Sequence, residues 1–87
     1  MLSTVDQKWI RIFDRLSQTR VPIDVLMRSE PYRAGLVTGR SAAANGKELI
    51  HALDENYSPA YLLGIIDGWL DVYLTKIEKD NADRDED

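Results

Sequence analysis

The fold is decided by residues 58–79, SPAYLLGIIDGWLDVYLTKIEK, which form the most apolar stretch of the chain. Ser58 is a favourable N-cap, and Pro59 suits the first helical position because its missing N–H needs no partner there. When successive residues are placed about 100° apart, the apolar side chains fill an arc of roughly 200°, whereas a surface helix needs only about 100°. We therefore expect the central helix of an all-α domain, covered on two of its sides.

A narrow strip of this helix combines two glycines with two carboxylates: Gly64 and Gly68 lie beside Asp67 and Asp71. If the strip faces solvent, each glycine costs about 1 kcal/mol relative to alanine. If another backbone approaches closely, from the same chain or from a partner, glycine permits the approach because it has no Cβ. We therefore take this strip as the first candidate for a partner-binding surface.

The same stretch is unsuited to crossing a membrane. Its apolar core is about 15 residues long and contains two aspartates, whereas a transmembrane helix needs about 20 apolar residues. The N-terminal sequence MLSTVDQKWIRIF lacks the uninterrupted apolar segment of a secretory signal. The chain has no cysteine, which excludes a disulfide framework and a catalytic thiol. We expect a cytoplasmic protein that does not contact a membrane.

Two further main helices and a short connecting helix are predicted before the central one. Residues 4–18 place apolar side chains at helical spacing, and we expect Trp9 and Phe13 of this row to lie in the core. Pro22 begins a short connecting helix that would close one end of the core. Together with residues 30–54, these segments predict a small bundle of three main helices within a single domain, residues 1–79.

Residues 30–54 follow a good N-cap, Ser29, and carry a row of small and apolar residues at alternating spacings of four and three. Gly35 and Gly39 belong to this row or widen it, so another helix could approach closely. The pair Asn45–Gly46 is a turn signal that competes with the continuous phase of the row. We expect one continuous helix, with two helices separated at Asn45–Gly46 as the alternative.

The net charge of −4 is unevenly distributed along the chain. Residues 1–47 carry eight basic and four acidic side chains, whereas residues 48–77 carry one basic and five acidic ones. The last ten residues add six acidic and two basic side chains, and we expect residues 80–87 to form an acidic flexible tail. The basic half is therefore predicted to pack beside the acidic half, within one chain or between two.

Catalytic and metal-binding functions have little support in the sequence. Glu48 and His51 have the i, i+3 spacing of di-iron bundles, but such sites need two of these pairs and further carboxylates. A symmetric dimer could complete the set with Asp67 or Asp71, which leaves a metal site across a dimer as one alternative. There is no nucleophile turn and no glycine loop that would hold a phosphate. We expect a protein without enzymatic activity, cofactor or metal.

Nucleic-acid binding is the other alternative. Arg33, Arg40 and Lys47 recur at seven-residue intervals, and a basic row of this kind could contact phosphates. The chain as a whole is acidic, whereas nucleic-acid-binding domains are usually strongly basic.

The sequence best fits a small protein-binding module, because a chain of 87 residues is marginally stable alone and oligomerisation would supplement its core. We expect a helical homo-oligomer, most simply a homodimer, or a small acidic regulator or inhibitor of a larger protein. The candidate partner-binding residues are Gly64, Asp67, Gly68, Asp71, Gly35, Gly39, Arg33, Arg40 and Lys47.

Overall fold

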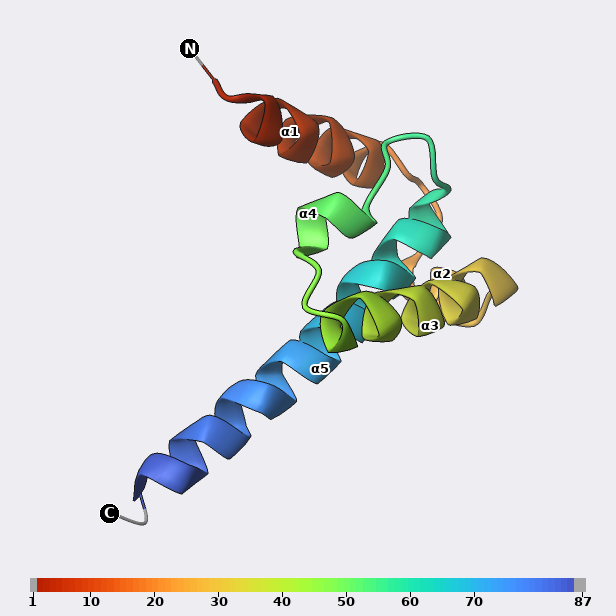
Figure 1. Ribbon diagram of the computed structural model, residues 1–87. Helices are drawn as coiled ribbons and strands as arrows, with labels where there is room; N and C mark the ends of the chain where they lie inside the picture. Colours follow the sequence, from red (N-terminus) through yellow and green to blue (C-terminus); the bar gives the residue numbers. More distant parts are fainter. Residues whose placement is uncertain (1, 86–87) are drawn as a thin grey trace.

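The computed structural model describes the backbone of residues 2–85 and the side chains of residues 2–80 (Figure 1). Between residues 2 and 85 the chain forms helices and no strand, in the order α1 (Thr4–Ser17), α2 (Ile23–Leu26), α3 (Glu30–Ala44), α4 (Leu49–Ala52) and α5 (Pro59–Asp85). The predicted all-α fold with three main helices is confirmed. The helix α2 is the predicted short one, and α4 is the separate helix of the alternative with a break at Asn45–Gly46.

The two longest helices, α3 and α5, form the most extensive contact in the molecule, with α3 lying across α5 (Figure 1). Each begins with the predicted serine cap. The hydroxyl of Ser29 accepts a hydrogen bond from the Tyr32 amide at 3.4 Å, and that of Ser58 accepts one from the Tyr61 amide at 3.3 Å. These caps satisfy amide groups that have no partner inside the first turn.

The apolar core lies between α1, α4 and the first half of α5. Its buried members come from these three helices and from the residue that follows α4, and they are Ile12, Ile50, Leu53, Leu62 and Ile65. The short helix α4 contacts both α1 and α5, so it connects α1 to the rest of the protein. Nowhere in residues 2–85 does a helix combine the length and the hydropathy needed to cross a membrane.

Residues 30–54 do not form the single helix that we favoured. The helix α3 ends at Ala44, and Gly46 adopts a left-handed conformation with φ of 77°. The amide of Gly46 then donates to the Ala43 carbonyl at 3.1 Å, and that of Lys47 donates to the Ala42 carbonyl at 2.9 Å. This pair of bonds is a Schellman motif, in which glycine ends a helix and satisfies its last carbonyls. The Asn45–Gly46 signal therefore outweighs the continuous phase.

The prediction that Phe13 lies in the core is wrong. Its side chain is 60% exposed and stacks on Trp9, which is half-buried at the edge of the core. The residue of α1 that is fully buried is Ile12. Since α1 touches the protein mainly along α4, only part of its apolar side is covered. The described helix α2 likewise has no buried residue, so it does not close the core.

The prediction that the central helix is covered on two sides holds for its first half only. Up to Trp69, α5 packs against α3 on one side and against the core on the other. The second half of α5 extends away from the other helices (Figure 1). Of its apolar side chains, Leu70, Tyr73, Leu74 and Ile77 are exposed. The helix continues through Asp85 and so includes residues 80–85 of the predicted tail. Residues 86 and 87 of that tail lie outside the described part of the chain.

Candidate functional site

The four glycines predicted to bind a partner lie at the contact between two helices of the same chain. Gly35 and Gly39 of α3 face Gly64 and Gly68 of α5, and all four are buried. A Cβ at Gly64 would overlap the carbonyl oxygen of Tyr32 and would lie 3.0 Å from the Cα of Gly35. Of the two possibilities for the glycine strip, close approach by another backbone is therefore the one observed. The approaching backbone is α3 of the same chain, so these glycines are not part of a free surface.

The sequences of α3 and α5 share a pattern that explains this contact and that our reading of the sequence missed. Residues 29–39 and 58–68 both follow Ser-x-x-Tyr-x-x-Gly-x-x-x-Gly. The two copies pack with approximate twofold symmetry, because each tyrosine reaches the other copy. The hydroxyl of Tyr32 donates to Asp67 at 2.6 Å, and the hydroxyl of Tyr61 shares a hydrogen bond of 2.8 Å with Thr38. A search for internal repeats would have found this signal.

The predicted carboxylates also face α3. Burial, and after it the hydrogen bond from its hydroxyl to Asp67, raises the pKa of Tyr32 to about 12. One turn further along α5, Asp71 forms an exposed ion pair with Arg40 at 3.5 Å. A second exposed pair, Arg11–Glu55 at 3.7 Å, also joins the basic half of the chain to the acidic half. The predicted packing of the two halves is thus present within one chain.

The basic row proposed for nucleic-acid binding does not lie on one helix. Arg33 and Arg40 belong to α3, but Lys47 follows the turn that ends this helix. Arg40 is paired with Asp71, whereas Arg33 is exposed. The structure therefore brings no continuous row of three cations together.

Glu48 and His51, the pair considered for a metal site, lie close together, but within residues 2–80 they are not joined by the further ligands that such a site needs. His51 Nε2 lies 3.7 Å from Glu48 Oε2, and both side chains are exposed. The carboxylates that would complete the site, Asp67 and Asp71, are held against α3. In the described residues, no three His, Asp or Glu side chains are grouped closely enough to hold a metal ion.

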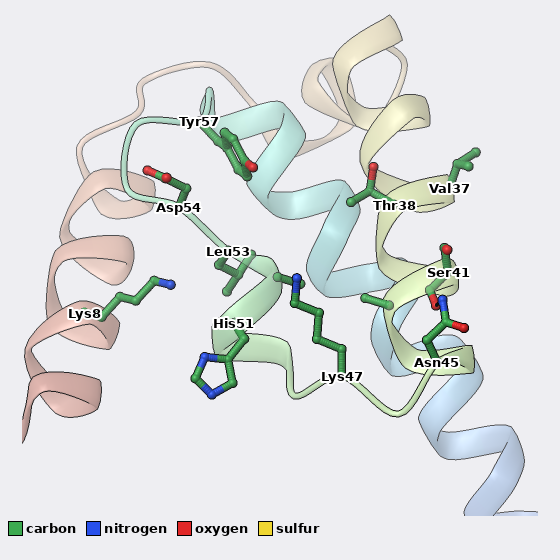
Figure 2. A pocket seen from close by; sticks show the side chains of 12 residues that line it. Lys8, Val37, Thr38, Ser41, Asn45, Lys47, His51, Leu53, Asp54 and Tyr57 are labelled. Atoms are coloured by element: carbon green, nitrogen blue, oxygen red, sulfur yellow. Dashed lines mark hydrogen bonds between the residues drawn. The ribbon is translucent and has the colours of Figure 1, made fainter.

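A cavity of about 620 Å³ lies between α1, α3 and α4 (Figure 2). Lys8 extends into it from α1, and Lys47 extends into it from the segment between α3 and α4. His51 and Asp54 also line the cavity, together with hydroxyl and amide groups of α3. Ala42, Ala52 and Leu53 give it an apolar floor. Small polar molecules match this lining better than an apolar peptide does.

A smaller hollow of about 380 Å³ lies where the end of α3 meets α5. Trp69 and Tyr73 form its aromatic wall, with stacked rings whose centroids are 4.8 Å apart. The Trp69 indole N–H donates to the Lys47 carbonyl at 2.7 Å, and the Lys76 ammonium donates to the Ala43 carbonyl at 2.9 Å. These bonds fix both side chains against the turn that ends α3.

Next to this hollow, α5 presents a row of large apolar side chains to solvent. The row, called the α5 face below, consists of Leu70, Tyr73, Leu74 and Ile77, which are 37%, 44%, 53% and 36% exposed. Their spacing places them on one side of the helix, away from the glycines that contact α3. The sequence predicted that these residues would be covered, but each of them keeps a third or more of its surface exposed.

No family model matches the chain, and comparisons with curated proteins and with solved structures return no match.

Proposed function

We propose that this protein is a non-enzymatic protein-binding module that associates with a second copy of itself through the α5 face. One observation carries the proposal: four large apolar side chains remain 36% to 53% exposed on a helix whose preceding turns are buried. Contiguous exposed apolar surface of this kind marks interaction sites in soluble proteins. Amphipathic helices bind partners through side chains spaced three, four and seven residues apart.

The size of the α5 face fits an interface between two small proteins. With roughly 150–250 Å² for each large side chain, the exposed fractions of its four residues amount to about 350 Å². A standard interface buries about 800 Å² on each partner, and a little over half of this area is apolar. The α5 face would therefore supply most of the apolar area that such a dimer needs.

The distribution of charge favours a second copy as the partner. Residues 1–47 carry four more basic than acidic side chains, and residues 78–87 carry four more acidic than basic ones. Within one chain α5 leads away from α1, so its acidic end points away from that helix (Figure 1). A second copy lying alongside in the opposite direction would bring oppositely charged parts of the two chains together, which favours their encounter.

The test is the molar mass of the protein in solution, measured by light scattering after size exclusion. At tens of micromolar we expect a dimer for the unmodified chain and a monomer for Leu74→Glu, because a carboxylate would be buried in the interface. The matched control is Val25→Glu, which adds the same charge at a valine of α2 that is 50% exposed. This variant should remain a dimer.

A monomeric unmodified chain would contradict the proposal. So would a dimer that persists in Leu74→Glu and dissociates in Val25→Glu, because the contact would then involve α2. If the chain is monomeric but a foreign protein binds it and is lost in Leu74→Glu, the face serves a regulator or inhibitor of a larger protein instead.

A further inference from the structure

We infer that the cavity between α1, α3 and α4 is a binding site for a small organic anion that carries a carboxylate or a phosphate group. The inference does not depend on the α5 face, which lies on a different part of the molecule. It rests on the residues that the fold brings together from distant parts of the sequence: Lys8, Lys47 and His51 (Figure 2).

The size of the cavity suits a small molecule. Its volume of about 620 Å³ lies within the usual range of roughly 300–1,000 Å³ for ligand sites. Such sites combine an apolar surface with a few polar groups that converge on the ligand. Here the apolar part is the floor of Ala42, Ala52 and Leu53, and the polar groups surround it.

The charges around the cavity favour an anion. The ammonium groups of Lys8 and Lys47 extend toward the same hollow from two different elements (Figure 2). Among the side chains of residues 2–80, neither lysine forms an ion pair. A carboxylate or phosphate placed between them would accept charge-assisted hydrogen bonds, which are roughly twice as strong as neutral ones.

The same lining limits the ligand to a small one. Asp54 stands at the edge of the cavity, and Glu48 is paired with His51 beside it. These two carboxylates would repel a long polyanion such as a nucleic acid, whose many phosphates need an extended basic surface. One anionic group can lie between the lysines while the rest of a small molecule contacts the floor and the hydroxyls of Thr38 and Ser41.

The experiment is a titration of the ¹⁵N-labelled 87-residue chain with inorganic phosphate and, separately, with succinate, at an ionic strength held constant with sodium chloride. We expect saturable shifts of the backbone amides that line the cavity with at least one of the two probes. Saturation by phosphate alone assigns the site to phosphate compounds, and saturation by succinate alone assigns it to carboxylates. The double variant Lys8→Ala/Lys47→Ala should weaken binding by about tenfold or more.

The matched control is Lys79→Ala, which removes an exposed lysine of α5 outside the cavity and should change the affinity less than about twofold. Because Lys8 is half-buried, its replacement could disturb the fold, so the single variant Lys47→Ala is also measured. The Lys47 side chain is exposed, and the variant keeps the backbone groups of residue 47 that form hydrogen bonds with the turn and with Trp69. The inference is overturned if neither probe gives saturable shifts in the cavity. It is also overturned if Lys47→Ala and Lys79→Ala bind equally well, because any lysine on the surface would then serve.

Discussion

Both halves of α5 carry several large apolar side chains, but their surroundings differ. In residues 59–69 the helix contacts α3 on one side and the core on the other, and Leu62 is inaccessible to solvent. In residues 70–80 the helix leaves the core and contacts the end of α3 through the polar side chains of Asp71 and Lys76, and Leu74 is 53% exposed. Hydrophobic side chains therefore indicate which face of a helix favours burial. How much of that face is buried depends on the length of the helices that pack against it.

Helix length explains why α3 packs mainly against the first half of α5. At 1.5 Å per residue, α3 is about 22 Å long and α5 about 40 Å long, so α5 must extend beyond its neighbour. The Schellman turn at Gly46 stops α3 and sends the chain back toward the core as α4. Because α3 ends there, its contacts with the second half of α5 are limited to polar ones such as Arg40–Asp71 and Lys76–Ala43.

The largest effect is expected from Gly64→Ala in the first half of α5. Its new Cβ would meet the backbone of α3 on Tyr32 and Gly35, and backbone cannot move aside as a flexible side chain can. The cost should be on the order of 5 kcal/mol, beyond the usual 1–3 kcal/mol of overpacking, and well above the gain of about 1 kcal/mol in helix propensity. Urea unfolding followed by circular dichroism measures it.

The control for this change is Gly46→Ala, at a glycine with no neighbour that a Cβ would meet. Its positive φ makes alanine unfavourable by about 1 kcal/mol. If Gly64→Ala were no more destabilising than Gly46→Ala, the close contact between α3 and α5 would not exist in solution.

A comparison of two leucines tests the difference between the halves directly. Leu62→Ala in the core should cost about 2–5 kcal/mol, because it removes buried surface and leaves a cavity. Leu74→Ala should cost less than about 1 kcal/mol at protein concentrations low enough to keep the chain monomeric. Both values come from urea unfolding of dilute protein. Equal losses would mean that the second half of α5 is covered within the monomer.

The sequence predicted the helices more reliably than it predicted their contacts. Local signals, such as the caps at Ser29 and Ser58, depend on adjacent residues and were confirmed. The environment of the glycine strip was ambiguous, because Gly64 lies outside the apolar arc. That position is compatible both with exposure to solvent and with contact by another backbone. The repeated tyrosine–glycine pattern could have resolved this point. Phe13 was misplaced because an apolar row on α1 does not tell how much of it another helix reaches.

The cavity and the exposure of the α5 face are harder to predict from the sequence than the helices are. Lys8 and Lys47 are separated by most of α1, α2 and α3, and only the turn after α3 directs the second lysine toward the first. The α5 face was recognised as apolar, but its exposure follows from the end of α3 at Ala44. Both features arise from the break at Asn45–Gly46, which we predicted only as an alternative.

The smallest effects concern the polar contacts on either side of the boundary in α5. Tyr32→Phe removes the hydrogen bond to half-buried Asp67 and should cost about 2 kcal/mol, because the acceptor is charged and loses its partner. Arg40→Ala removes the ion pair to Asp71, one turn further on, and should cost less than about 1 kcal/mol because both side chains are exposed. Urea unfolding at neutral pH measures both variants, and a larger loss in Arg40→Ala would reverse the assignment of strong and weak contacts.

The pH dependence of stability distinguishes the tyrosine contact from a simple loss of packing. The pKa of Tyr32 is raised from 10.0 to about 12 by burial and by Asp67, so the folded state keeps its phenol proton at pH values where the unfolded state has lost it. Below pH 10 this contribution is fully present, and it is lost as the pH rises through about 12. At about 1.36 kcal/mol per pKa unit, the loss should reach up to about 3 kcal/mol in the unmodified chain. In Tyr32→Phe this part of the pH dependence should vanish, whereas ionisation of the other tyrosines affects both proteins alike. Parallel stability curves for the two proteins above pH 10 would show that the Tyr32 phenol is not held against Asp67 in solution.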